Sequence, residues 1–246
     1  YLNGYGISLG KKIIIFTNND SAYQTAIDYY HQNINIIAIV DLRNEISEGL
    51  PLKVKNLGIK IYYGSIISDT IGRKKIKAVK IKKIEKENNN KNNVEVLDCD
   101  LLCMSGGWSP TVHLFTQSRG KLKFREEDSC FVPHQAYQQT ISVGSCNGVF
   151  DLRSILRETN TSVNNFLVES KRSIVGNEIY DSEEIKVTKQ KNNWLIHDND
   201  KIRKSKIFVD FQNDVTAKDI KLALSEGFQS IEHVKRYTTN GMATDQ

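Results

Sequence analysis

Apolar and polar positions alternate in blocks along the first hundred residues of the chain. Residues 13–16 and 36–40 are uninterrupted apolar runs rich in isoleucine, a pattern typical of strands buried on both faces of a sheet. Residues 22–30 carry apolar side chains at helical spacing, and the polar residues 17–21 before them supply turn and N-cap chemistry. The pattern predicts a strand–helix–strand unit of Rossmann type.

The hydrophobic pattern also predicts further elements downstream of this unit. The expected strands are residues 60–63, 101–104 and 141–143, and the expected hairpin pairs residues 74–85 with 94–97. The hairpin tip, residues 86–93, is rich in Asn and Lys and is expected to be solvated. One helix is expected from about residue 149 to about residue 173.

The end of the chain has a helical pattern of its own. Helices are expected near residues 217–226 and 231–237. Thr216 is a suitable N-cap for the first of them, and Gly227 a suitable C-cap. The sequence therefore predicts an α/β region followed by a small helical module.

The chain carries a formal net charge of +5 and has a pI near 8.9. A basic balance can indicate a nucleic-acid or anionic-membrane partner. Here the lysines are interleaved with Asn and Ile, and no basic stripe carries the aromatic residues that a single-strand groove needs. No run reaches the roughly 18 apolar residues of a membrane helix. We therefore expect neither nucleic acid nor a membrane as partner.

The four cysteines, Cys99, Cys103, Cys130 and Cys146, do not form a metal-ligand set. Cys99 and Cys103 lie four apart across an expected strand, and neither a second cysteine pair nor a histidine pair accompanies them. The sequence predicts no metal site and free, buried thiols in a reducing cytosol. Cys146 follows an expected helix start, where a thiol pKa can be lowered; a buried, inert thiol is the favoured interpretation.

The turn after the first strand is the first candidate for chemistry. A dinucleotide site needs a glycine-rich turn here, because the pyrophosphate must approach bare backbone. Residues 17–21 contain no glycine, and Asp20 places a negative charge where the pyrophosphate would lie. Asp41 ends the second strand, where a ribose-binding acid belongs. Two interpretations stay open: a modified dinucleotide site that uses Asp41, or a Rossmann unit kept as scaffold.

Several long strings in the chain resemble one known family. They are GKKIIIFTNNDSAYQTA, GGWSPTVHL, TISVGSCNGVFDL and RYTTNGMATDQ. All resemble the alpha subunit of heterotetrameric sarcosine oxidase, and the chain is expected to be a fragment of such a subunit. The resemblance implies part of a two-dinucleotide-domain flavoprotein fold, Rossmann-like, followed by a small helical module. The implied domains are a nested second dinucleotide domain at 1–105, a return to the first nucleotide domain at 106–175, a connecting segment at 176–206 and the small module at 207–246.

The resemblance implies two nucleotide contacts. Gly106 and Gly107 would allow close approach to a bound nucleotide, with Trp108 beside them and Pro110 fixing the exit direction; plain core packing is the other interpretation of Trp108. Gly144-Ser145 stands where two-domain flavoproteins usually have Gly-Asp against the nucleotide, and the substitution fits NAD bound in the flavin-like first domain. The other interpretation of this position is a simple helix N-cap. No catalytic residue is assigned.

The terminal module resembles one that holds a two-iron two-sulfur cluster on four cysteines. Three of those positions fall on Asp210, Gln212 and Asp245, and the fourth lies past Gln246. Because such clusters need thiolates, the sequence predicts no iron–sulfur cluster.

The implied enzyme oxidises sarcosine to glycine with FAD and FMN in the complex, produces hydrogen peroxide and passes the one-carbon unit to tetrahydrofolate in a C-terminal domain beyond this chain. The implied partners are the beta, gamma and delta subunits, the location is cytoplasmic, and the share of this chain is NAD binding and subunit contact. Two alternatives stay open: a subunit of a related amine or opine dehydrogenase complex, and a structural scaffold without cofactor.

Overall fold

The computed structural model describes residues 1–84, 94–173, 180–183, 191 and 206–243. The chain divides into two compact units, Tyr1–Asn193 and Trp194–Gln246. The two units are described separately below. The expected hairpin tip at 86–93 lies outside the described residues, and the four-part domain division expected from the sequence stays a prediction.

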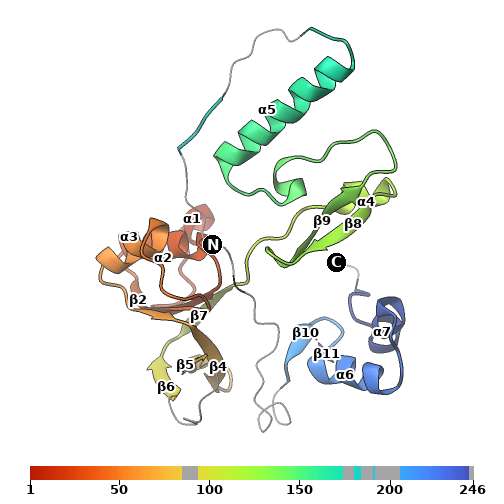
Figure 1. Ribbon diagram of the computed structural model, residues 1–246. Coiled ribbons are helices and arrows are strands. Elements are labelled where there is room, and N and C mark those ends of the chain that lie inside the picture. The colour runs from red at the N-terminus through yellow and green to blue at the C-terminus, as the bar shows by residue number, and fades with distance from the viewer. Residues whose placement is uncertain (85–93, 174–179, 184–190, 192–205, 244–246) are drawn as a thin grey trace. The chain divides into compact units, whose positions relative to one another are not determined.

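The first unit is built on a parallel sheet with the strand order β3-β2-β1-β7 (Figure 1). Its strands are β1 (Lys12–Thr17), β2 (Asn35–Asp41), β3 (Ile61–Tyr63) and β7 (Leu101–Ser105). Three helices accompany this sheet: α1 (Leu2–Tyr5), α2 (Ser21–His31) and α3 (Gly49–Asn56). The expected strand–helix–strand unit and the α/β fold class are confirmed.

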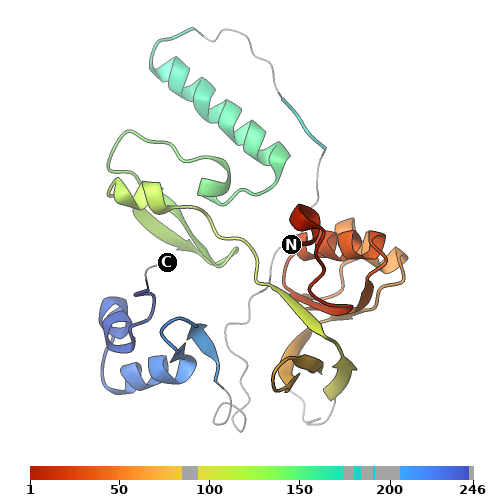
Figure 2. The ribbon, with the colours of Figure 1, turned by 180° about the vertical axis from the view of Figure 1, so that it is seen from behind.

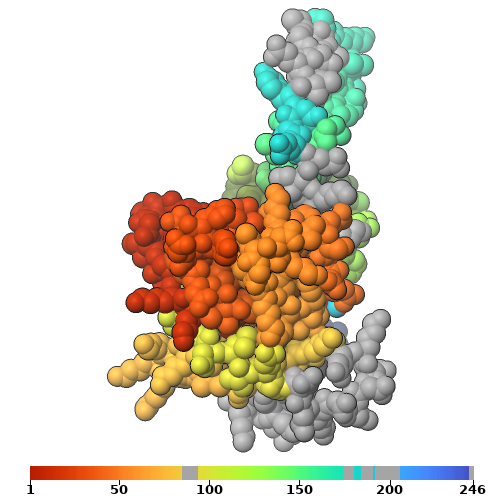
Figure 3. Space-filling model, turned by 90° about the vertical axis from the view of Figure 1, so that its left-hand side faces the viewer, coloured from red at the N-terminus to blue at the C-terminus, as the bar shows by residue number. Residues whose placement is uncertain are grey.

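The parallel sheet is covered on both faces, which explains the uninterrupted apolar runs. Ile13 and Ile15 pack with Tyr23 of α2 on one face. Ile14 and Val40 pack on the other face, against a three-stranded antiparallel sheet. That sheet consists of β4 (Ser65–Gly72), β5 (Ile76–Lys83) and β6 (Val94–Asp98). Figure 1 shows the helices and the antiparallel sheet on opposite sides of the parallel strands, and in the space-filling view of Figure 3 the red-to-orange residues lie above the yellow ones.

A second part of the first unit follows β7. It contains α4 (His113–Gln117), the hairpin β8 (Lys121–Arg125) and β9 (Cys130–Gln135), the short 3-10 helix η1 (Gly144–Asn147) and α5 (Leu152–Glu169) (Figure 2). The strand expected at 141–143 is wrong: these residues are irregular, and Ile141 is 62% exposed. A short Ile-Ser-Val segment forms a strand only where a neighbouring strand satisfies its backbone, and no described strand pairs with it.

The second unit contains the small module expected at the end of the chain. Its elements are β10 (Phe208–Asp210), β11 (Val215–Thr216), α6 (Ala217–Ser225) and α7 (Ile231–Thr238). Thr216 is the N-cap of α6, and the Asp219 carboxylate accepts a hydrogen bond from its N–H at 2.7 Å. Gly227 follows the C-cap with φ +94°, a conformation that glycine adopts readily. Both expected helices and the expected N-cap are confirmed.

Candidate functional site

The carboxyl edge of the parallel sheet is where an open α/β fold binds ligands. β1 lies between β2 and β7, so the strand order of this parallel sheet reverses at β1. Thr17 at the end of β1 pairs with Ser105 at the end of β7. Ligands of such sheets bind outside the strand ends at this switch point. The residues that follow β1 and β7 therefore decide whether this unit can hold a nucleotide.

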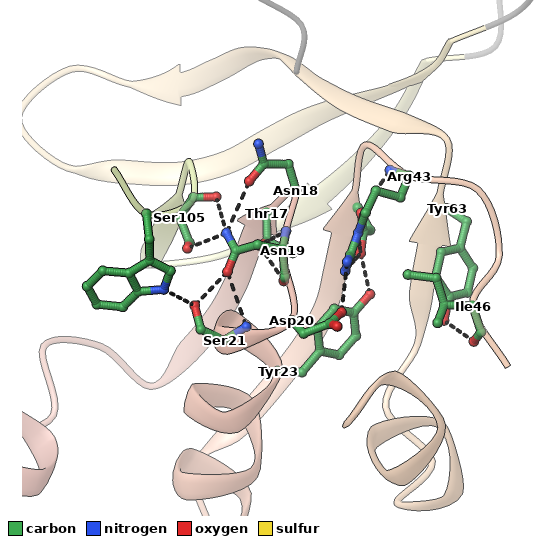
Figure 4. Close-up of polar contacts among 12 residues, drawn as sticks. Thr17, Asn18, Asn19, Asp20, Ser21, Tyr23, Arg43, Ile46, Tyr63 and Ser105 are labelled. Atoms are coloured by element: carbon green, nitrogen blue, oxygen red, sulfur yellow. Dashed lines mark hydrogen bonds and ion pairs between the residues drawn. The ribbon is translucent and has the colours of Figure 1, made fainter. Parts of the chain in front are cut away.

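Asn19 bridges the two strand ends in place of a glycine-rich turn (Figure 4). Its Nδ2 donates to Ser105 Oγ at 2.9 Å and to Asn18 Oδ1 at 3.0 Å. Its Oδ1 accepts hydrogen bonds from the backbone N–H of Ser21 at 3.1 Å and from Ser21 Oγ at 2.5 Å. The turn is thus held by its own side chains, and the helix N-terminus is occupied by Asn19.

Next to this bridge lies a buried ion cluster, also drawn in Figure 4. Arg43 donates from Nη1 to Asp20 Oδ1 at 2.7 Å, and from Nη2 to Asp41 Oδ2 at 2.8 Å. Tyr23 OH donates to the same Asp41 oxygen at 2.6 Å, and the backbone N–H of Arg43 donates to Asp41 Oδ1 at 2.8 Å. All four side chains are buried. Sequence reasoning placed Asp20 and Asp41 here and missed Arg43 and Tyr23.

The charges in this cluster are fixed by their surroundings. Burial opposes the charged form of Arg43, but hydrogen bonds and charges of Asp41 and Asp20 outweigh burial and raise the pKa of its guanidinium. Burial, followed by the Asp41 carboxylate, raises the pKa of the Tyr23 hydroxyl well above its usual range. Arg43 therefore stays charged and Tyr23 stays neutral near pH 7. Both oxygens of Asp41 already accept hydrogen bonds from protein groups, an arrangement that favours the scaffold interpretation of this Rossmann unit.

The segment after β7 is open to solvent, unlike the filled turn after β1. Trp108 is 62% exposed, so it is not a core residue of this unit, and its indole N–H donates to Ser21 Oγ at 3.1 Å. Gly106 is exposed, and no other group lies within 4 Å of the place where a Cβ would stand. Gly107 has φ +98°, and Pro110 is buried. These residues fit a nucleotide: bare backbone and an oriented aromatic ring face open space.

The second expected contact, at η1, lies against α5. Gly144 is buried with φ +66°, and its N–H donates to Glu158 Oε2 at 2.7 Å. Ser145 and Cys146 are exposed. The expectation of a buried Cys146 is wrong, because η1 presents this residue to solvent. Cys99 and Cys130 are buried as expected, and burial raises the pKa of both thiols. No group of His, Cys, Asp or Glu side chains among the described residues could hold a metal ion.

In the second unit, Asp210, one of the positions where the resemblance implies a thiolate in relatives, is a carboxylate with several hydrogen-bond donors around it. It is 4% exposed and accepts hydrogen bonds from the N–H groups of Gln212 (2.9 Å), Asn213 (3.2 Å) and Gly241 (2.9 Å), and from Asn213 Nδ2 (3.2 Å). The Gly241 N–H, followed by that of Asn213, holds the pKa of this carboxyl below its usual range. Asp245 lies outside the described residues. This donor set of hard oxygens does not fit an iron–sulfide core.

Comparison with known proteins shows which proteins the chain resembles. Residues 204–246 match the family model described as Sarcosine oxidase A3 domain. The chain is 29% identical over 251 residues to the sarcosine oxidase subunit alpha of Corynebacterium sp. (strain U-96), and 31% identical over 257 residues to that of Rhizobium meliloti (strain 1021). The chain is similar over its whole length to sarcosine oxidase alpha subunits. The resemblance seen in the sequence is therefore confirmed.

The similarity to these alpha subunits concerns part of each relative. The chain spans 26% of the Corynebacterium subunit and 23% of the Rhizobium subunit, about a quarter of their length. Among solved structures, the L-proline dehydrogenase of P. horikoshii superposes with a TM-score of 0.56 at 16% identity, over 98% of this chain and 43% of that one. This likeness shows the fold. Within the described residues, no helix has both the length and the apolar content to cross a membrane.

Proposed function

We propose that the chain is part of the alpha subunit of a heterotetrameric sarcosine oxidase, an oxidoreductase acting on a CH–NH group. The reaction would convert sarcosine, dioxygen and tetrahydrofolate to glycine, hydrogen peroxide and a folate that carries the one-carbon unit. FAD and FMN, when bound in the complex, would supply the oxidation of the N-methyl group and the reduction of dioxygen. The beta, gamma and delta subunits would be the partners, and the cytoplasm the location. The whole-length similarity to alpha subunits supports this proposal.

The share of this chain in that enzyme would be to contact NAD and to support the neighbouring subunits. The single observation that carries this proposal is the contrast at the sheet edge. The turn after β1 is filled by Asn19 and by the Asp20–Arg43 pair, whereas Gly106 and Trp108 face open space. A pyrophosphate would meet a turn already filled by its own side chains at the first site and bare backbone at the second. NAD would therefore be contacted by residues 106–110, and the resemblance to alpha subunits adds Gly144-Ser145 as a second contact.

The small module would act as a packing element without an iron–sulfur cluster. Asp210 and Gln212 offer oxygen and amide groups in place of thiolates, and the Asp210 carboxylate is bonded to protein N–H groups. No electron-transfer step is therefore assigned to this module. A related amine or opine dehydrogenase subunit is the rival enzyme, and a scaffold without cofactor is the rival outside enzymes.

The purified complex tests these proposals together. Full-length subunit co-expressed with beta, gamma and delta subunits is expected to produce peroxide in a sarcosine-dependent manner, to release NAD on acid treatment, and to read blank for iron and acid-labile sulfide. The isolated 246-residue chain is expected to show no such peroxide production. Absence of any released nucleotide would favour the scaffold, and stoichiometric iron with sulfide assigned to this subunit would favour a cluster-bearing dehydrogenase.

The variant Asp20→Ala tests whether the first turn meets the nucleotide. In the full-length complex the dissociation constant of NAD is expected to stay within about twofold of wild type, a change of about 0.4 kcal/mol. The reason is that the Asp20 carboxylate is directed at Arg43 and not at an open site. Ser21→Ala removes the acceptor of the Trp108 indole N–H. It is the positive comparison at the same turn, for which a change in the dissociation constant of NAD is expected. A tenfold change for Asp20→Ala, measured by titration calorimetry, would place the nucleotide at this turn.

A further inference from the structure

The turn that contains Ser145 is packed directly on α5. Gly144 has φ +66°, and a Cβ at this position would stand 3.1 Å from Cγ2 of Ile155. Both features favour glycine at this position. A larger residue at this position would force both a strained backbone and a tighter contact with Ile155.

Glu158 holds both ends of this turn from two turns inside α5. One carboxylate oxygen accepts the backbone N–H of Gly144 at 2.7 Å, and the other accepts Asn147 Nδ2 at 2.6 Å. The helix that carries Glu158 is itself fixed at its start, because the Asp151 side chain caps it by accepting the N–H of Ser154 at 2.9 Å. A single carboxylate therefore spans η1 from its first residue to its last.

The far side of the turn is held by the β8–β9 hairpin. Arg125 of β8 donates from Nη2 to the carbonyl oxygen of Gly148 at 3.1 Å. Gly148 has φ +76°, and a Cβ there would stand 2.5 Å from that same nitrogen. The turn is thus clamped between α5 and the hairpin, and Ser145 and Cys146 are left exposed at its apex.

We propose that Glu158 is a positioning residue for nucleotide binding, which it serves by holding the Gly144–Asn147 turn in the shape that presents Ser145. This inference rests on the proposed function, namely that Gly144-Ser145 contacts NAD. A turn that is ordered before the ligand arrives loses little conformational freedom on binding, whereas a loose turn must be ordered at the cost of affinity. Glu158 has no contact with NAD in this proposal and acts through the turn.

The test compares three substitutions on the same surface of the full-length complex. Glu158→Ala removes both hydrogen bonds and is expected to weaken NAD binding roughly tenfold and to speed amide hydrogen exchange at residues 144–147. Glu158→Gln can accept the Gly144 N–H and donate to Asn147 once that amide is flipped, so it is expected to restore both readouts to near wild type. Glu169→Ala, at the exposed end of α5, is the matched control and should change neither.

Asn147→Ala covers the case in which Glu158→Ala does not fold. It removes one of the two bonds and is expected to weaken NAD binding roughly threefold with a smaller gain in exchange. Faster exchange at 144–147 with unchanged NAD affinity in these variants would overturn the inference, because the turn would then not meet the nucleotide. A wild-type complex that binds no NAD would instead overturn the proposed NAD contact itself, and the inference with it.

Discussion

Replacing Arg43 with alanine is expected to lower the local free energy of unfolding of the parallel sheet by about 3–5 kcal/mol, the usual cost of removing one partner from a buried ion pair. Arg43 is the cation shared by Asp20 and Asp41, and all three side chains are buried. Without the guanidinium, two carboxylates face each other in a poorly solvated site. Hydrogen exchange of the β1 and β2 amides in the full-length subunit measures the loss.

Two further variants separate charge from geometry in this cluster. Arg43→Lys keeps the positive charge but lacks the planar fork that reaches both carboxylates, so its loss should fall between wild type and alanine. Lys55→Ala removes the cation of an exposed pair with Glu45 and should leave exchange almost unchanged. A loss for Arg43→Ala of less than about 1 kcal/mol, the range of exposed pairs, would show that the cluster is solvated and open to a ligand.

The central elements of the first unit could be predicted because their burial is visible in the sequence. The runs at 13–16 and 36–40 are apolar without interruption, and both are strands within one residue of each end. The triplet at 141–143 has two apolar residues around Ser142 and no described strand beside it, and it is irregular. The β8–β9 hairpin was missed even though Leu122 and Phe124 alternate with lysines, because two strands of five and six residues leave only a short pattern.

Some residues of the candidate site could also be predicted from local sequence, whereas others depend on long-range packing. The missing glycines at 17–21 and the glycine pair at 106–107 are local features, and they indicated which turn could approach a nucleotide. Arg43 joins Asp20 across 23 residues of sequence, and Glu158 reaches back 14 residues to Gly144. Such partners are chosen by the packing of helix on strand or helix on turn, so no local pattern reveals them. The exposure of Trp108 is likewise a property of the packed unit.

The terminal module depends on one carboxylate for its internal connections. Asp210 accepts hydrogen bonds from the turn that follows β10 and from Gly241 beyond α7, and so it links the hairpin to the chain after the last helix. Asn213 Nδ2 adds a second link, to the carbonyl oxygen of Thr239 at 3.0 Å. A module of this size has a small core, to which Val215, Ala223 and Val234 contribute buried apolar side chains among the described residues. Its shape should therefore be sensitive to the charge at position 210.

Asp210→Asn is expected to loosen the module, since the new amide N–H2 would face the backbone donors that the carboxylate now accepts. Exchange of the Gln212, Asn213 and Gly241 amides in the full-length subunit should become roughly tenfold faster.

The pKa of Asp210 is lower in the folded state than its usual value, so the contribution of this carboxylate to the stability of the module is complete above about pH 4 and is lost as the pH falls further. Wild-type protection should therefore decrease at acidic pH, while the variant should show no such decrease. Asp214→Asn, at an exposed position of the same turn with φ +59°, is the control that keeps the backbone conformation and should behave as wild type. Equal exchange in the two variants would mean that the module is held by its apolar core alone.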